Sequence, residues 1–262
     1  RQHPIVPDPN LVDEAARMLV TARQPLIHAG SGVVHACASK ELHEVAEALQ
    51  SPVCTSWGAR GVMAEDNNLA LPMLHVELNN QVRNDADVVL GIGSRFGETD
   101  WWGKAPYWRQ PAEQKLIHVD CDDEILGLNK PADLMILADA KIFLTALRDR
   151  LASMQVANEP ERQAALARYS EQRSKHRQKL DKHLEDQAEP MITAHIPHTC
   201  KQIFDSDAVY VIDGGNAAVW GNFYHEVKTP HTVLGTAKFG MLGAGVAQAI
   251  GAAVARPDKQ VY

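Results

Sequence analysis

The sequence has few cysteines and no closely spaced cysteine pair. Its 262 residues include four cysteines, Cys37, Cys54, Cys121 and Cys200. None of them has the Cys-x-x-Cys spacing of zinc ribbons, treble-clef folds or thioredoxin-type redox sites, so these classes are excluded. Sparse cysteines fit a reducing compartment, and we therefore expect a cytoplasmic protein.

Basic charge and long apolar runs are also missing. Lysine and arginine number 26 against 33 aspartate and glutamate residues, which gives a net charge of −7. Without a basic excess to neutralise phosphates, we expect neither a nucleic-acid nor an anionic-membrane partner. No apolar run reaches the roughly 18 residues that a transmembrane helix needs, and the proline-containing start is not typical of a signal peptide.

Both ends of the sequence indicate a piece of a longer chain. The first residue is Arg1 rather than methionine. Residues 259–262 have the pattern of a strand that stops before it finds a partner. We therefore expect a fragment.

Residues 11–150 alternate between short apolar runs and helical patterns. Strands are predicted at 25–29, 53–55, 87–93, 115–120 and 134–137, and helices at 39–50 and from Asp139, as the N-cap, to about Leu151. Continuous apolar strands between helices indicate a parallel sheet covered on both faces. The sequence therefore predicts an α/β fold.

A charged stretch from 159 to 189 separates this region from a second one. It favours a solvated, protease-accessible helix that links two domains, with a partner-binding helix as the alternative. We place a first domain at 1–155, a charged helical linker at 156–190 and a second α/β unit at 191–262. In that second unit a helix is predicted at 194–204, with strands at 208–212 and 232–234.

Two glycine-rich segments in the second unit each join a strand end to a helix start. They are residues 213–217 and 240–245. Ligands of open parallel sheets bind beyond the carboxyl ends of strands, and the N–H groups at a helix start attract anions. An ordinary turn is the alternative interpretation of residues 213–216, because Asp-Gly-Gly-Asn is also a favourable turn sequence.

In this order, the motifs resemble the thiamine diphosphate (ThDP) enzymes of the acetolactate synthase superfamily. Nearly the whole chain takes part in the resemblance. The central-domain matches are residues 25–32, 57–66, 86–96 and 117–122, and the diphosphate-domain matches are 211–220 and 239–252, including Phe239.

The resemblance implies a sirtuin-like, nucleotide-binding central domain followed by part of a ThDP-binding domain. It implies that Gly215, Asn216 and Ala217 contact the diphosphate of ThDP. Gly240 would offer its carbonyl to the 4′-amino group, Leu242 would be the apolar wedge that bends the cofactor, and Met241 lies between them. In the central domain, Gly93, Ser94, Arg95 and Asp120 are the candidate contacts for FAD or ADP. Asp139 is a further candidate, with the helix N-cap as its alternative role.

The resemblance also implies an activity, and this chain departs from the family pattern in some places. The whole protein would make or break C–C bonds next to a carbonyl, as a carboligase, a 2-keto acid decarboxylase or a 2-hydroxyacyl-CoA lyase, acting on a 2-keto acid or acyl-CoA as a homodimer or homotetramer. Ala217 stands where many acetolactate synthases carry histidine, which places the chain off their main branch. The Mg²⁺ segment and the activating glutamate would lie outside Arg1–Tyr262, so we expect this piece alone to be inactive, with no catalytic residue and no metal ligand of its own.

Several residues leave more than one interpretation open. Arg60 suits a phosphate contact or a surface role, and the aromatic residues Trp101, Trp102, Tyr107 and Trp108 suit a packed loop or stacking on a flat ring. His195 and His198 are a poor metal pair, because we expect Pro197 to break the helix. The alternative function is a non-catalytic FAD- or ADP-binding module, against which the diphosphate-domain motifs speak.

Overall fold

A six-stranded parallel sheet forms the centre of the first unit, residues 3–158. The computed structural model describes residues 3–236 and 240–262. The strand order is β3-β2-β1-β4-β5-β6, and every pair is parallel, which confirms the predicted α/β fold. The strands are β1 (Pro25–Ala29), β2 (Val53–Thr55), β3 (Ala70–Leu71), β4 (Val88–Ile92), β5 (Lys115–Asp120) and β6 (Leu134–Leu137).

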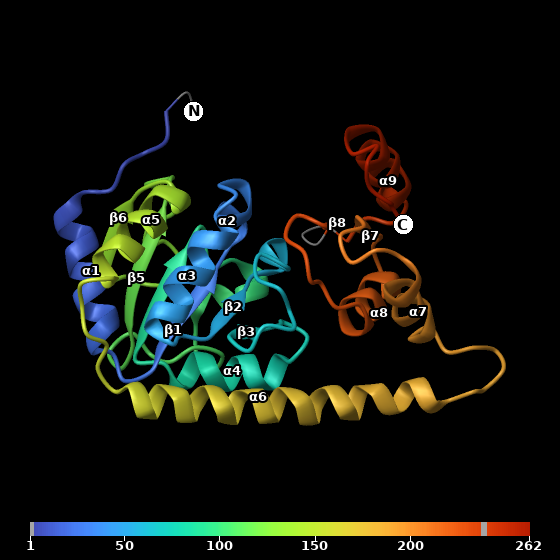
Figure 1. Ribbon diagram of the computed structural model, residues 1–262, viewed down its shortest axis with the longest axis horizontal. Helices are drawn as coiled ribbons and strands as arrows, with labels where there is room; N and C mark the ends of the chain where they lie inside the picture. Colours follow the sequence, from blue (N-terminus) through green and yellow to red (C-terminus); the bar gives the residue numbers. More distant parts are fainter. Residues whose placement is uncertain (1–2, 237–239) are drawn as a thin grey trace.

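Helices cover both faces of this sheet (Figure 1). Short 3₁₀ turns, η1 (Trp57–Ala59) and η2 (Glu98–Gly103), follow β2 and β4. Asp139 caps α5 by accepting hydrogen bonds from the N–H groups of Lys141 (2.9 Å) and Ile142 (3.3 Å), as the sequence predicted. The helices of this unit are α1 (Pro9–Thr21), α2 (Ser31–His35), α3 (Ser39–Leu49), α4 (Val76–Asp85) and α5 (Ala140–Leu151).

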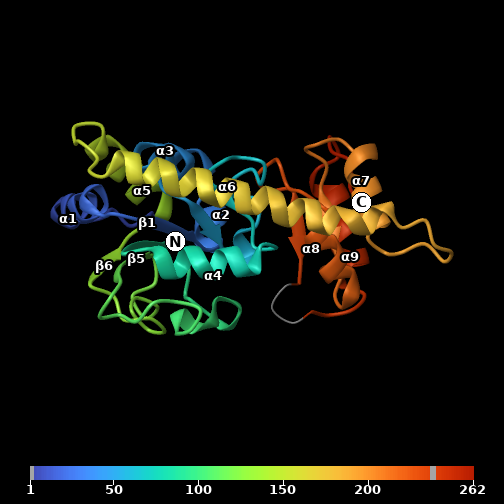
Figure 2. The same ribbon diagram turned by 90° about the horizontal axis from the view of Figure 1, so that it is seen from below.

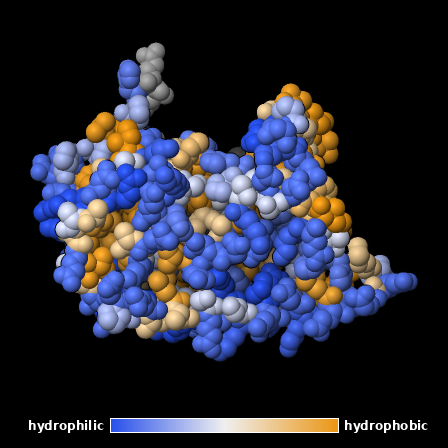
Figure 3. All heavy atoms as spheres, viewed as in Figure 1, coloured by the Kyte–Doolittle hydropathy of each residue, from blue (hydrophilic) through white to orange (hydrophobic). Residues whose placement is uncertain are grey.

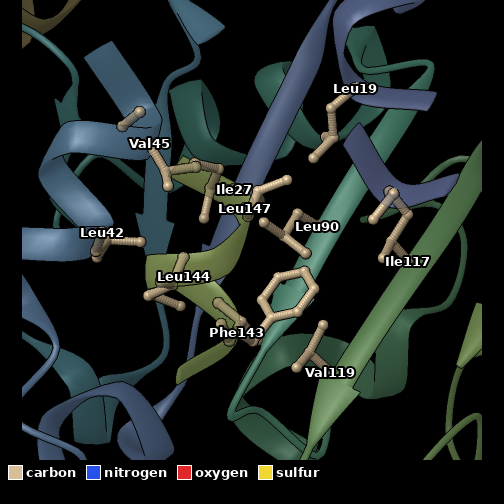
Figure 4. Close-up of a cluster of buried hydrophobic side chains, with 14 of the residues drawn as sticks. Leu19, Ile27, Leu42, Val45, Leu90, Ile117, Val119, Phe143, Leu144 and Leu147 are labelled. Atoms are coloured by element: carbon tan, nitrogen blue, oxygen red, sulfur yellow. The ribbon is translucent and has the colours of Figure 1, made fainter. Parts of the chain in front are cut away.

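The main core lies between the sheet and α1, α3 and α5 (Figure 4). Leu90 of β4 and Phe143 of α5 are fully buried there. Each such side chain contributes roughly 1.5–3 kcal/mol by leaving water. The opposite face packs against α4, the loop that carries Phe96 and Trp108, and the first half of a long helix, α6 (Glu159–Asp181).

The predicted charged linker is the 23-residue helix α6 (Glu159–Asp181). It runs along the first unit and reaches the second (Figures 1 and 2). It is not simply solvated, because Arg162, Ala165 and Tyr169 are buried. Arg162 donates hydrogen bonds to carbonyl oxygens at the ends of α1 and α3, and Tyr169 donates to Asp85 (2.9 Å). Helix α6 therefore has one solvated face and one face that packs against the first unit.

The second unit, residues 195–262, is smaller. Its strands β7 and β8 are parallel. Residues 260–262 pair with Val209 and Val211 on the other edge of β7, through Val209 N–H to Gln260 O and Val211 N–H to Tyr262 O (both 2.8 Å). The expectation that this last segment has no partner was therefore wrong. The elements are the 3₁₀ turn η3 (Lys182–Glu185) before the unit, then α7 (His195–Ile203), β7 (Tyr210–Ile212), α8 (Asn216–Tyr224), β8 (Val233–Gly235) and α9 (Ala244–Ala255).

Pro197 lies inside α7 rather than ending it. Proline is tolerated in the first turn, where its missing N–H has no intrahelical partner to lose. The predicted helix break was therefore wrong. His195 donates from Nε2 to the Asp186 carbonyl oxygen (2.9 Å), and His198 Nε2 accepts from the Gln202 amide (3.0 Å). Within residues 3–236 and 240–262, no group of three or more potential ligand side chains is placed to hold a metal ion.

Candidate functional site

The two glycine segments of the second unit lie in contact. A Cβ on Gly214 would overlap the carbonyl oxygen of Gly240. Gly215 (φ 66°) and Gly240 (φ 56°) both have the left-handed backbone that favours glycine. The sequence predicted both segments, and the structure brings them together at the carboxyl end of β7.

The two helices that follow these segments differ at their first turns. The carboxylate of Asp213 accepts hydrogen bonds from the N–H groups of Gly243 (2.8 Å) and Gly245 (3.0 Å) at the start of α9. These backbone donors, that of Gly243 first, lower the pKa of Asp213 below its usual value. Among the described residues, no side chain caps α8 in this way. The N–H groups at the start of α8 are therefore left for an anion.

A cavity of about 400 Å³ lies beside these segments and between the two units. The second unit supplies Gly214, Gly215 and Gly240, together with Ala218 and Asn222 of α8. A cavity of this size fits a small-molecule ligand. The first unit supplies the opposite wall, formed by Trp57, Gly58, Arg60 and Thr99.

The remaining ThDP candidates do not line this cavity but are neighbours in sequence of Gly215 and Gly240, which do. Asn216 and Ala217 are exposed and form the first turn of α8. Leu242 is 77% exposed, and its Cδ2 lies 3.0 Å from where a Cβ on Gly215 would be, while Met241 is 52% exposed. Lys238 and Phe239, part of the same sequence motif, lie outside the described residues.

Arg60 is a buried link between the units, so the surface interpretation was wrong. Its guanidinium pairs with Glu65 (Nε to Oε1, 2.7 Å) and donates to Asn222 Oδ1 (2.7 Å) and to the His225 carbonyl oxygen. Most of its donors are thus used by protein groups. Nothing in the local sequence pattern indicates this cluster, because Asn222 and His225 lie 162 and 165 positions from Arg60.

The FAD or ADP candidates gather at the carboxyl edge of the larger sheet. Gly93 (φ 60°) packs against Gly32, and the Gly32 N–H donates to its carbonyl oxygen (3.0 Å). Ser94 is buried, and its Oγ and carbonyl oxygen accept from Phe96 N and His118 Nε2. Backbone therefore fills the space directly above β1 and β4.

The other two candidates at this edge face outward. Arg95 is exposed, and Asp120 is partly buried at the end of β5. Burial raises the pKa of Asp120, and its Oδ1 accepts from the Asp122 N–H (3.1 Å). A nucleotide at this edge would meet these two side chains rather than the glycines.

The aromatic residues at 101, 102, 107 and 108 do not all fit the same interpretation, a packed loop or stacking on a flat ring. Trp108 is fully buried and donates from Nε1 to the Asp100 carbonyl oxygen (2.8 Å), which fits a packed loop. Trp101 stacks on Tyr107 with ring centroids 4.0 Å apart, yet it is 39% exposed, and Trp102 is 44% exposed. Stacking on a ligand ring is therefore open to Trp101 and Trp102 only.

Over the described part of the chain, no helix combines the length and apolar character needed to cross a membrane. This agrees with the lack of long apolar runs in the sequence.

Comparison with known proteins gives a consistent picture. The family model "Thiamine pyrophosphate enzyme, central domain" matches residues 12–147, and "Thiamine pyrophosphate enzyme, C-terminal TPP binding domain" matches residues 213–262. A Methanocaldococcus jannaschii protein named "Probable acetolactate synthase large subunit" is 30% identical over 97% of this chain and 43% of its own length. The "Acetolactate synthase" of Mycobacterium bovis is 27% identical over 98% of this chain and 41% of its own length.

A solved structure has the same fold. The "X-ray structure of a putative thiamin diphosphate-dependent enzyme isolated from Mycobacterium smegmatis" superposes with a TM-score of 0.71 at 18% sequence identity. The match covers 98% of this chain and 48% of that one. The chain thus spans less than half of the length of these relatives.

Proposed function

The chain belongs to the thiamine pyrophosphate (thiamine diphosphate) enzymes, and from this premise we propose that the cavity between its two units holds ThDP. The diphosphate would lie at the start of α8, against the N–H groups of Gly215, Asn216 and Ala217. Gly240 would accept a hydrogen bond from the aminopyrimidine, and Leu242 and Met241 would pack against the cofactor rings.

One observation carries this proposal. Two glycine segments touch beside the cavity, and of the helices they precede, α9 is capped by Asp213 whereas α8 has no side-chain cap among the described residues. A helix start with unused N–H groups and a glycine backbone suits a diphosphate. The residues present therefore fit the cofactor that the family model names.

We propose that the whole protein is an enzyme of the acetolactate synthase type. ThDP, when bound, supplies an electron sink for bond making and breaking next to a carbonyl group. The names of the relatives favour a carboligase that acts on 2-keto acids, ahead of a decarboxylase or a lyase. An acyl-CoA substrate is the alternative, because Ala217 stands where many acetolactate synthases have histidine.

The proposal also covers the metal, a second nucleotide and the assembly of the protein. Mg²⁺ would be held by residues outside this chain, and FAD or ADP would lie near Arg95 and Asp120. The homodimer or homotetramer and the cytoplasmic location stay predictions. The alternative, a non-catalytic nucleotide-binding module, gains no support from the comparisons.

Calorimetric titration with ThDP in the presence of Mg²⁺ tests the binding proposal. We expect ThDP to bind and thiamine, which lacks the diphosphate, to bind at least about tenfold more weakly. Gly214→Ala should abolish ThDP binding, because its methyl group would push the Gly240 segment away. Gly251→Ala is the matched control, since a Cβ there meets nothing within 4 Å. Equal affinity for thiamine and ThDP, or unchanged binding by Gly214→Ala, would contradict the proposal.

A further inference from the structure

A buried ion pair of the first unit forms hydrogen bonds to the end of α8. Arg60 and Glu65 form two parallel hydrogen bonds, Nε to Oε1 (2.7 Å) and Nη2 to Oε2 (3.0 Å), and their side chains are only 3% and 5% exposed. Such a bidentate pair fixes orientation as well as distance. Both residues lie on the segment that follows η1 and precedes β3.

The remaining side-chain hydrogen bonds of the pair all cross to the second unit. Arg60 donates to Asn222 Oδ1 (2.7 Å) and to the His225 carbonyl oxygen, next to the end of α8. Glu65 accepts from the Val227 N–H, and its own N–H donates to the Val227 carbonyl oxygen (both 2.8 Å). The pair therefore holds both the last turn of α8 and the segment after it.

The close approach of the two segments depends on a glycine. Gly61 has φ 78°, and a Cβ at this position would lie 2.5 Å from Cγ1 of Val227. Val227 itself is 1% exposed. The first unit is thus shaped around the residues that follow α8.

Hydrogen bonds continue from Arg60 to the start of α8. Asn222 accepts from Arg60 and donates from Nδ2 to the Ala218 carbonyl oxygen (2.7 Å). Ala218 in turn donates from its N–H to the Gly215 carbonyl oxygen (3.1 Å). Arg60, Asn222 and Ala218 all line the cavity between the units.

We propose that Arg60 and Glu65 are positioning residues, which fix α8 from the first unit and so hold the Gly214–Ala217 segment in the place where it meets the diphosphate. The link to a diphosphate rests on the proposed function. The positioning of α8 does not, because it follows from contacts within this chain.

A role in packing alone is the competing explanation. A buried ion pair costs much desolvation energy and often contributes little net stability compared with apolar side chains of similar size. Apolar side chains could therefore fill the space that Arg60 and Glu65 occupy, and packing alone does not require an ion pair. What apolar side chains cannot supply is a set of directed hydrogen bonds to Asn222, His225 and Val227, and this favours positioning.

Hydrogen exchange measured on the 262-residue chain separates the two explanations. In Arg60→Met, we expect the amides of Ala218–Tyr224 to exchange at least about tenfold faster, while those of β4 keep their wild-type rates. Arg162→Met is the comparison variant: it removes another buried arginine, whose partners lie at the ends of α1 and α3, and it should speed exchange in the first unit rather than selectively in α8. If the α8 amides of Arg60→Met exchange faster only by the same factor as the β4 amides, the proposal is overturned.

The affinity for ThDP with Mg²⁺ gives the second readout. We expect Arg60→Met to weaken binding about tenfold and Arg60→Lys, which keeps the charge but not the two parallel hydrogen bonds, to weaken it less. Asn222→Leu leaves the ion pair intact and should also speed α8 exchange, which covers the case that Arg60→Met does not fold.

The outcomes distinguish this inference from the proposed function. If the wild-type chain does not bind ThDP but α8 responds to the variants, the positioning of α8 is supported and the proposed function fails. If the wild-type chain binds ThDP and Arg60→Met binds equally well, the positioning proposal is overturned.

Discussion

At the scale of single residues, two buried arginines join segments that lie far apart in the sequence: Arg60 links the two units, and Arg162 links α6 to the ends of α1 and α3. Asp139 could be predicted as a helix cap because its partners are two and three positions away. Arg60 and Arg162 could not, because their partners are set by tertiary structure. Arg162 sits in a charged run yet is 1% exposed, and it donates to the carbonyl oxygens of Leu19, Val20, Ala22 and Leu49.

Replacing Arg162 with methionine should destabilise the first unit strongly. The guanidinium satisfies carbonyl groups at the ends of two helices, where the helix dipole also favours a cation. Leaving these buried acceptors without donors should lower the free energy of unfolding by roughly 3–5 kcal/mol. Urea unfolding measures this, with Arg17→Met on the exposed face of α1 as the control. A loss no larger than that of the control would show that the hydrogen bonds contribute little.

A second residue-scale prediction concerns pH. His75 at the start of α4 and His176 of α6 share a hydrogen bond between their Nδ1 atoms (2.6 Å). Burial, and then the nearby His176, Arg173 and Arg177, lower the pKa of His75 from 6.5 to about 3. The unfolded chain thus takes up this proton more readily, and stability present above pH 6.5 is lost as the pH falls towards 3.

His75→Gln should therefore flatten the dependence of stability on pH. We expect the wild-type chain to lose about 2 kcal/mol more than this variant between pH 7 and pH 5. Urea unfolding at a series of pH values measures the difference. His35→Gln, at an exposed position of α2, is the control and should follow the wild-type curve. Parallel curves for wild type and His75→Gln would refute the assigned cause.

At the scale of elements, the buried parallel strands were the most predictable feature. Continuous apolar runs bounded by glycine or acidic residues located β1, β4, β5 and β6, and a short strand-like run after Pro52 located β2. The two-residue strand β3 is too short to leave a pattern, and α4 has too few apolar positions. Helix α6 was predicted as a helix, but its docking was not, because arginine and tyrosine make the contacts that apolar residues make elsewhere.

Because α6 is docked along its length, proteolysis should begin after it. Residues 185–191 are exposed and lie outside any helix except for Glu185, the last residue of η3. We expect a non-specific protease to cut first within 185–192 and to leave residues 159–181 intact. Mass spectrometry of the early fragments identifies the site. A first cut inside α6 would instead support the freely solvated linker that the sequence alone predicted.

At the scale of the whole molecule, the two units differ in how much of their apolar surface is covered by other elements. The large sheet has helices on both faces, whereas α9 presents apolar side chains to solvent (Figure 3). The small residues of α9 predicted a close-packing surface, and in this chain the exposed side is apolar. The exposed large apolar side chains of α9 and the segment before it are Met241, Leu242, Val246, Ile250 and Val254.

The second unit should therefore be the less stable part of the chain. We expect the amides of β7 to exchange at least about tenfold faster than those of β4 in a monomeric sample. We also expect this difference to shrink at higher protein concentration if a second copy covers α9. Equal protection of β4 and β7 in a strictly monomeric sample would refute this expectation.

The central claim, that the start of α8 holds the diphosphate of ThDP, is tested most directly by amide chemical shifts. Titrating the isotope-labelled chain with ThDP and Mg²⁺, and separately with thiamine and Mg²⁺, reports on each N–H group. The claim predicts that ThDP alone shifts the amides of Gly215, Asn216 and Ala217 most strongly. Shifts centred instead on Gly93, Ser94 and Arg95, with α8 unchanged, would contradict it.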